Sequence, residues 1–237
     1  MKRNKHVLST SNDAKTVKGE AKGFLTSVLY LAPFTLSGIN VCSHAKWSTC
    51  AEACLNTAGR GVFTQIQQSR IIKTKWFHSD QASFIEVMVQ DIEATIRKAD
   101  RLGLTPCIRP NGTSDLPWEN IKHKGKRLMD IFSRIQWYDY TKVPLRMKRF
   151  LNGEMPANYH LTFSRSGDND RAVDEVISRG GNVSAVFLHE PPTQWNGVSV
   201  INGDESDLRF LDPRGVIVGL KAKGKARKVQ ASFVINN

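Results

Sequence analysis

The sequence predicts an α/β protein in which strand–helix units repeat and form a partial parallel barrel. Short apolar runs rich in β-branched and aromatic residues alternate about five times with amphipathic segments of helical period. Such alternation is typical of parallel strands joined by crossover helices. Polar residues follow the apolar runs directly, as they do at the carboxyl edge of a parallel sheet. An open doubly wound sheet would produce the same alternation, so both arrangements stay open.

The first third of the chain contains an arm, a strand and a long loop. Residues 1–23 are polar and rich in Lys, Ser, Thr and Gly, and we expect an N-terminal arm without regular structure. We expect one α/β domain over residues 24–237, and its first strand over residues 24–32. Residues 33–60 then form a connection whose length indicates a functional loop. Residues 59–77 are expected to be helical.

The clearest helix follows this segment. Six apolar residues recur at steps of three and four, namely Ile85, Met88, Val89, Ile92, Ile96 and Ala99. Ser79 or Asp80 can cap the start of the helix, and Gly103 can end it.

The remaining elements are expected on the same grounds. Strands are expected at residues 104–110, 135–140, 158–164, 183–189 and 215–222. Helices are expected at residues 119–135, with an interruption near Gly125, at 145–151 and at 168–179. Residues 197–212 are expected to be irregular or to form a hairpin.

The chain is strongly basic, with a formal net charge of +12 over 237 residues. The positive charges cluster in three segments: Lys122, Lys124, Lys126 and Arg127; then Arg146, Lys148 and Arg149; then Lys221, Lys223, Lys225, Arg227 and Lys228. Clustered positive charge favours a polyanion, so we expect nucleic acid or a nucleotide as the partner. The most apolar early segment, residues 24–34, has about eleven residues, whereas a membrane-spanning helix needs about twenty. We therefore expect no membrane partner, and the oligomeric state stays open.

Polar residues that follow the predicted strands are the candidate ligand-binding residues. Parallel strands end at one edge of the sheet, so these side chains should share one face. The candidates are Asn111, Ser114 and Asp115 after the second strand, Asp139 and Lys142 at the third, Ser164 and Arg165 at the fourth, and Lys221 at the last.

Three of the four cysteines, Cys42, Cys50 and Cys54, lie in the loop after the first strand with the spacing C-x7-C-x3-C. Cys107 lies inside a predicted strand and is expected to be a buried core residue. The trio could be free or disulfide-bonded thiols, although an odd number leaves one thiol unpaired. With His44 it could instead bind zinc. We favour a [4Fe–4S] cluster, because thiolates are the usual cluster ligands and three of them leave one iron open.

This layout resembles that of the radical S-adenosylmethionine (SAM) enzymes, in which a three-cysteine loop follows the first strand of a β/α barrel. The resemblance implies SAM as a ligand of the open iron. The run Gly215-Val216-Ile217-Val218-Gly219 is similar to a glycine–isoleucine–glycine strand motif of that superfamily. The usual spacing C-x3-C-x2-C is not present, however. The Gly-Gly-Glu element expected after the second strand is replaced by residues 111–115, NGTSD.

A second resemblance covers nearly the whole chain. The segments KGEAKGFLTSVLYLAP, CLNTAGRG, NGTSDLPWE, YDYTK, NYHLTFSRS, DLRFLDP and GVIVGLKAKG occur in this order. In these motifs the chain resembles the gene product 88 family of tailed phages. The resemblance implies a phage protein that acts in the cytoplasm of the bacterial host. The cysteine loop is one of the matching motifs.

Three functions compete at this point. The favoured one is a phage iron–sulfur protein, with a radical-SAM-like enzyme as its catalytic version, acting on nucleic acid or nucleotides. The alternative is a nucleic-acid-binding protein without enzymatic activity that contains a structural zinc or cluster site. A third is a metal-dependent nuclease that uses the acidic residues Asp204, Glu205, Asp207 and Asp212.

Overall fold

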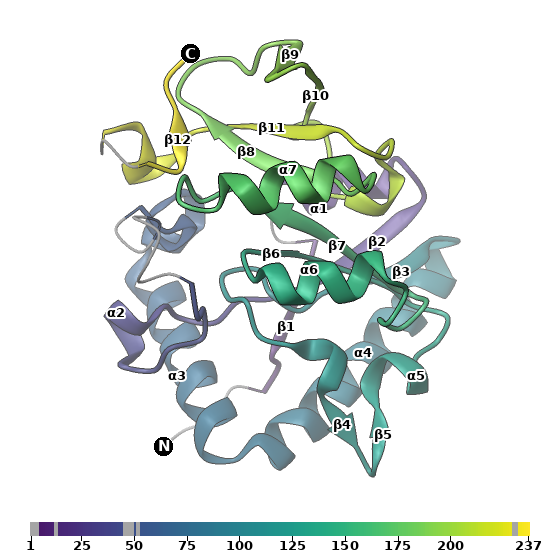
Figure 1. The fold of residues 1–237 in the computed structure, drawn as a ribbon. Coiled ribbons are helices and arrows are strands. Elements are labelled where there is room, and N and C mark those ends of the chain that lie inside the picture. The colour runs from purple at the N-terminus through teal and green to yellow at the C-terminus, as the bar shows by residue number, and fades with distance from the viewer. Residues whose placement is uncertain (1–4, 12–13, 45–49, 51–52, 229–231) are drawn as a thin grey trace.

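A ten-stranded, largely parallel sheet forms the centre of the protein (Figure 1). The computed structural model describes residues 5–11, 14–44, 50, 53–228 and 232–237. The strands of this sheet are β1 Leu8–Thr10, β2 Phe24–Leu29, β3 Thr105–Arg109, β6 Gln136–Thr141, β7 Tyr159–Ser164, β8 Val183–Phe187, β9 Gln194–Trp195, β10 Val198–Asn202, β11 Ile217–Lys221 and β12 Val234–Ile235.

Neighbouring strands of the sheet mostly follow one another along the chain. The order is β1-β2-β3-β6-β7-β8-β11-β10-β9, with β12 pairing with the end of β8. All pairs from β2 to β10 are parallel, whereas β1 and β9 add at the edges in antiparallel orientation. The prediction of a parallel β/α repeat is therefore confirmed. Among the described residues β1 does not pair with β9, so the strands do not close a barrel.

The main helices cover the apolar face of this sheet. They are α3 Thr64–Ser79, α4 Gln81–Leu102, α6 Pro144–Leu151 and α7 Asp170–Ser178. Register places Ile108, Trp137, Phe163, Val183 and Ile217 on one face of five neighbouring strands. These residues form one core with Met88 of α4, Met147 of α6 and Val173 of α7. None of the described helices is long and apolar enough to cross a membrane.

The helix α4 has the ends that its sequence predicts. The carboxylate of Asp80 accepts a hydrogen bond from the backbone N–H of Ser83 at 3.1 Å, which caps the first turn. Gly103 ends the helix in the left-handed region at φ 66°. Cys107, on the following strand, is fully buried as expected.

Two predictions of local structure are wrong. Residues 119–135 are not an interrupted helix, because Lys124 and Gly125 both have positive φ and turn the chain into the hairpin β4 Lys122–His123 and β5 Lys126–Arg127. Only the short 3-10 helix η4 Trp118–Asn120 at its start and α5 Leu128–Ile131 are helical there. The polar lead-in is not wholly irregular, since it contains β1 and α1 Ala14–Glu20.

The opposite face of the sheet carries several polar side chains, and α1 covers part of it beside β2. Register places Tyr138 beside His160 and Tyr140 beside Thr162 on this face. The segment that follows β10 packs against it, because η5 Arg209–Leu211 contacts β6 and β7. Asp207 from this segment accepts a hydrogen bond from the Arg109 guanidinium at 2.8 Å. The Tyr138 hydroxyl donates to the same carboxylate at 3.3 Å. Part of this face is therefore filled by the protein's own polar side chains.

Candidate functional site

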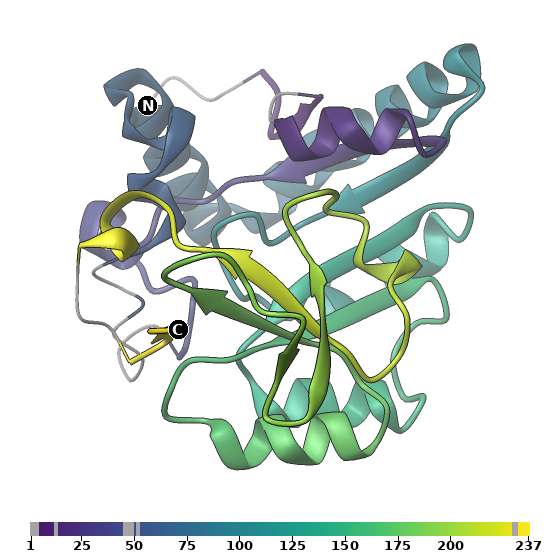
Figure 2. The same cartoon turned by 90° about the horizontal axis from the view of Figure 1, so that it is seen from above.

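The carboxyl edge of the parallel sheet brings the cysteine loop together with the loops after three other strands. The cysteine loop follows β2, Asp115 lies in the loop after β3, and Lys142 directly follows β6. Ser164 ends β7, where its hydroxyl accepts a hydrogen bond from the Lys142 ammonium at 3.0 Å. In Figure 2 the arrowheads of β8 and β11 point toward this side of the molecule.

Asn111 organises the loop after β3 through hydrogen bonds of both its side-chain nitrogen and its side-chain oxygen. Its side-chain nitrogen donates to the Asp139 carboxylate and to the Leu116 carbonyl, both at 2.9 Å. Its side-chain oxygen accepts from the Ser114 hydroxyl at 2.8 Å and from the Leu116 N–H at 2.9 Å. Asn111 and Ser114 therefore use the polar atoms of their side chains to shape the loop.

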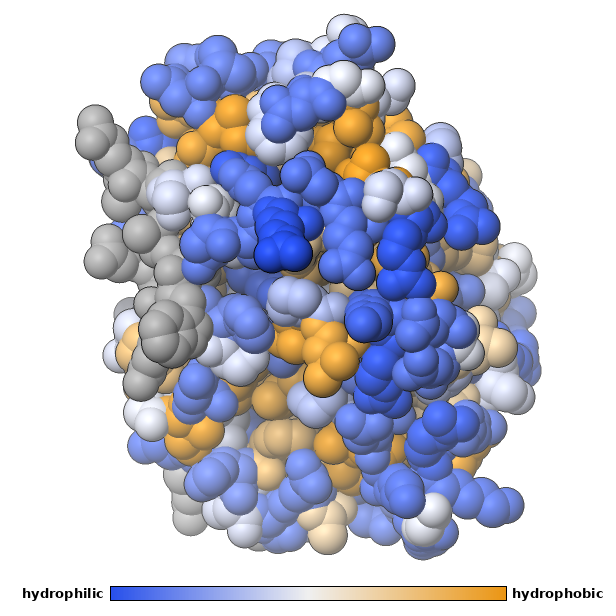
Figure 3. Space-filling model, in the orientation of Figure 1, coloured by the Kyte–Doolittle hydropathy of each residue, from blue (hydrophilic) through white to orange (hydrophobic). Residues whose placement is uncertain are grey.

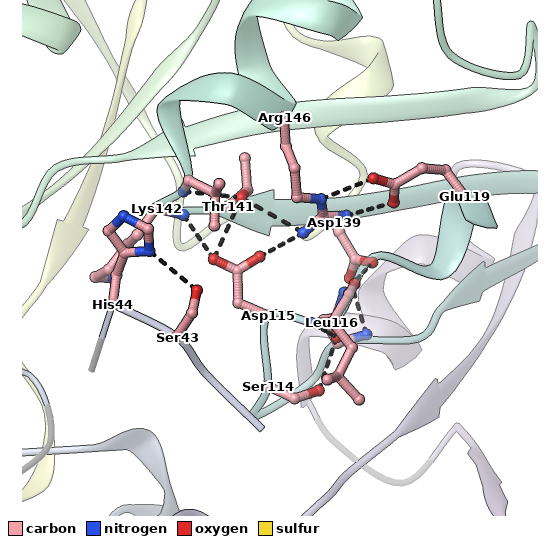
Figure 4. A network of polar contacts seen from close by, with 12 residues as sticks. Ser43, His44, Ser114, Asp115, Leu116, Glu119, Asp139, Thr141, Lys142 and Arg146 are labelled. Atoms are coloured by element: carbon pink, nitrogen blue, oxygen red, sulfur yellow. Dashed lines mark hydrogen bonds and ion pairs between the residues drawn. The ribbon is translucent and has the colours of Figure 1, made fainter. Parts of the chain in front are cut away.

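Asp115 links this loop to the end of β6 (Figure 4). Its carboxylate accepts hydrogen bonds from the Lys142 backbone N–H at 2.8 Å and from the Thr141 hydroxyl at 3.2 Å. Its other oxygen forms an ion pair with Arg146 of α6. The backbone N–H of Asp115 also donates to the carbonyl of Val41, which fixes the cysteine loop to this point. Asp115 thus anchors Cys42 relative to Lys142.

Asp139 lies beneath the loop and is completely buried. Burial raises the pKa of this carboxyl to about 7, although Arg109, Arg146 and Asn111 act in the opposite direction. The Tyr159 hydroxyl donates to it at 3.2 Å. Asp139 therefore belongs to the buried network below the edge, where Asn111 and Tyr159 occupy its oxygens.

The three thiols of the cysteine loop interact electrostatically with one another and with Lys142. Burial, followed by the nearby Asp115, raises the pKa of Cys42 to about 12, and Lys142 acts against this rise. Burial also raises the pKa of Cys54. Burial lowers the pKa of Lys142, but Cys50, Cys42, Asp115 and Cys54 outweigh it and raise the pKa overall. One ammonium group therefore lies within electrostatic range of three half-buried thiols.

The sulfurs do not form a closed metal site in this conformation. No three His, Cys, Asp or Glu side chains lie close enough together to hold a metal ion within the part of the chain that the structure describes. His44, the fourth ligand of the zinc alternative, has its ring nitrogen 3.0 Å from the Ser43 hydroxyl. Residues 45–49 and 51–52, which flank Cys50, lie outside the described residues.

Two other candidate residues form ion pairs. Arg165 pairs with Asp170 at 2.8 Å and lies over the ring of Trp195. Lys221 pairs with Glu190 at 2.9 Å, with both side chains largely exposed. The structure thus joins Asp115, Lys142 and Ser164 to the thiols, whereas Arg165 and Lys221 have partners of their own.

The acidic cluster does not converge on one metal site. Asp207 pairs with Arg109, Asp204 pairs with Lys223 at 2.7 Å, and Asp212 pairs with Arg209 at 3.3 Å. Because different cations neutralise these carboxylates, the geometry does not support the nuclease hypothesis.

Arg146 is a buried structural residue and not part of a basic binding surface. The sequence groups it with Lys148 and Arg149 in a basic cluster that is expected to attract a polyanion, but its side chain is only 8% exposed. Its guanidinium donates to both oxygens of Glu119, at 3.0 and 2.8 Å, and to the Tyr159 hydroxyl at 2.9 Å. The sequence does contain a hint of this burial: Arg146 is next to apolar Met147 in a short helix, and such a helix usually buries one of its sides.

Two grooves flank α7 on the outer face of the molecule. One runs between α7 and the β9–β10 hairpin, and the other between α6 and α7. Figure 3 shows apolar side chains among hydrophilic ones over this face. Neither groove is lined by a cysteine or by Lys142. The grooves are therefore separate from the thiol-rich edge.

The protein is therefore a parallel α/β protein in which the carboxyl edge of the sheet carries three thiols and a lysine ammonium. The chain belongs to the family described as gene product 88, whose model matches residues 6–237. This membership confirms the resemblance that the ordered motifs indicated. No curated protein and no solved structure matches the chain significantly.

Proposed function

We propose that this phage protein binds an iron–sulfur cluster through Cys42, Cys50 and Cys54 and acts in the cytoplasm of the bacterial host. The observation that carries the proposal is that all three thiols interact electrostatically with the Lys142 ammonium, which is hydrogen-bonded to Ser164 at the carboxyl edge. Ligands of parallel α/β proteins bind at this edge.

The donor set suits a soft metal centre. Three sulfurs are typical ligands for iron–sulfur clusters or zinc, and a thiolate rather than a thiol is the ligand. Thiols with raised pKa values stay protonated at neutral pH, so binding a metal must displace their protons. Lys142 compensates part of the negative charge that results. Because the sulfurs do not lie at ligand distance here, binding must also draw them together.

A cluster with three protein ligands would supply an electron and one iron open to a further ligand. The surrounding residues would orient that ligand: the Lys142 ammonium can hold an anionic group, and the Ser164 hydroxyl can donate or accept. In the enzymatic version, with a radical-SAM-like partial barrel, the ligand would be SAM. Release of 5′-deoxyadenosine after reduction would separate this version from a structural cluster.

Metal analysis of protein purified without oxygen tests the proposal. We expect brown protein with absorbance near 400 nm, iron and acid-labile sulfide, as thiolate-bound clusters give. Cys42→Ser, Cys50→Ser and Cys54→Ser should each lose iron. The matched control is Cys107→Ser, because Cys107 is buried on β3 and is not among the groups that shift the pKa of Lys142.

Two results would contradict the proposal. Protein that stays free of iron after anaerobic reconstitution would exclude a cluster. Iron that is lost equally in Cys107→Ser would show that it is bound elsewhere or adventitiously. If zinc is found instead, in amounts that depend on the trio, the site is structural and the alternative without enzymatic activity replaces the proposal.

A further inference from the structure

Two segments without acidic residues meet beside the cysteine loop. Residues 53–79 contain no Asp or Glu but include Arg60, Arg70, Lys73 and Lys75. Residues 213–237 likewise contain no acidic residue, and their basic residues are Arg214, Lys221, Lys223, Lys225, Arg227 and Lys228. A chain with 22 acidic residues thus keeps them out of both segments, which concentrates its positive charge.

The two segments are in direct contact. The turn η6 Gly224–Arg227 packs against η2 Leu55–Thr57, and η2 packs against η3 Gly59–Val62. A Cβ atom added to Gly224 would come within 2.9 Å of the Thr57 carbonyl oxygen, and Gly224 has φ +57°. Glycine therefore permits this close approach. Figure 2 shows η6 in yellow beside the blue and purple segments of the first third of the chain.

Charges on this surface differ in how far they are neutralised. Lys221 pairs with Glu190, and Lys223 pairs with Asp204. Lys225, Arg227 and Lys228 are exposed and form no ion pair with any described residue. These three side chains are therefore available to an anionic partner.

An exposed aromatic ring belongs to the same contiguous set of turns, in which η2 links η6 to η3. Phe63 follows η3 directly and is 59% exposed, the only aromatic residue among the large hydrophobic side chains exposed in the described part of the chain. Val62, the residue before it, and Leu55 of η2 are also exposed. Basic side chains next to an exposed ring are the combination that holds a single-stranded nucleic acid, in which phosphates pair with cations and unstacked bases lie on the ring.

We propose that η6, η2 and η3 form a binding surface for single-stranded nucleic acid, with Lys225, Arg227 and Lys228 on the phosphates and Phe63 under a base. A duplex offers no unstacked base to the ring, so single strands should bind more tightly. The surface adjoins the thiol-rich edge, but its binding does not depend on a metal there.

Fluorescence anisotropy with labelled oligothymidylate, oligouridylate and a duplex of the same length tests this inference. The variant Lys225→Gln/Arg227→Gln/Lys228→Gln should bind the single strand at least tenfold more weakly. The slope of log K against log salt should fall by about 2, since each lost contact removes about 0.7. The control Lys122→Gln/Lys124→Gln/Lys126→Gln removes the same charge from the β4–β5 hairpin, which lies away from η6 in Figure 1, and should bind like wild type.

The ring is tested separately. Phe63→Ala should weaken single-strand binding about fivefold or more, and leave any duplex binding unchanged. Phe63→Trp should keep the affinity, and its fluorescence should be quenched on binding. Comparison of thymidylate with uridylate assigns the surface to DNA or RNA.

Three outcomes would overturn the inference: no binding at low salt, equal weakening by both triple variants, or duplex binding as tight as single-strand binding. All measurements are made with metal-free and metal-loaded protein. Because the surface is proposed to bind in either state, failure of the cluster proposal would leave these results unaffected.

Discussion

Arg146 joins Asp115 to Glu119: its guanidinium pairs with one carboxylate on the cysteine-loop side and with the other beneath α6. All three side chains are nearly inaccessible to solvent. The geometry is bidentate at Glu119, which suits arginine and not lysine. The loop that carries Asp115 is therefore held in place by a buried charge network.

Removing Arg146 should strongly destabilise the protein. Arg146→Met leaves two buried carboxylates without their cation, which costs about 3–5 kcal/mol of unfolding free energy. Urea denaturation followed by circular dichroism measures the change. The control Lys148→Met lies on the exposed side of the same helix and should change stability by less than about 0.5 kcal/mol. Equal stability of the two variants would show that the network contributes little.

Lys142 should support metal binding through its charge. Lys142→Met removes the cation that interacts electrostatically with the three thiols, so thiolates become harder to form and cobalt affinity should fall about tenfold or more. Lys142→Arg keeps the charge and should retain most of the affinity. Cobalt titration followed by the thiolate–metal absorbance measures both. If Lys142→Met kept the wild-type cobalt affinity, the charge of Lys142 would not contribute to metal binding by the thiols.

Metal binding should strengthen steeply as pH rises. Burial raises the pKa values of Cys42 and Cys54, so both thiols carry protons at neutral pH and metal must displace them. The logarithm of the apparent cobalt affinity should rise by up to about 3 per pH unit if three protons leave. Cys42→Ser should lower this slope by about one. A slope near zero between pH 6 and 8 would mean that the thiols are not the ligands.

Sequence patterns predicted those helices and strands that neighbouring residues determine. The period of Ile85, Met88 and Ile92 and the caps Asp80 and Gly103 identified α4, because an amphipathic helix and its caps are written in adjacent residues. The β4–β5 hairpin was missed, since apolar Leu128 and Met129 after it suggested a helix. Its turn depends on positive φ at Lys124 and Gly125, and Lys rarely adopts that conformation.

The site could be predicted only in part, because several of its residues pair with side chains far away in the sequence. The order of strands placed Asp115, Lys142 and Ser164 at one edge, because parallel strands all end there. The partners of Lys221 and Arg146 lie 27 to 31 residues away along the chain, and no spacing rule encodes them. Arg109 was missed for the same reason, since its partner Asp207 lies 98 residues away. Arg165 pairs with Asp170 only five residues further on, at the start of α7.

His160 should make the protein sensitive to mild acid. Burial, followed by Arg209, lowers the pKa of this imidazole to about 4, below its usual value of 6.5. The neutral form is favoured in the folded state, so its contribution to stability is present above pH 6.5 and is lost as pH falls toward 4. The loss is on the order of 2–3 kcal/mol. In His160→Gln this part of the pH dependence should disappear, which urea titrations at pH 7.5, 6 and 4.5 would measure.

If the free energy of unfolding varied with pH in the same way in wild type and in His160→Gln, a buried neutral histidine would be contradicted. Asp139 titrates in an overlapping range with the opposite sign, but it is present in both proteins and cancels from their difference.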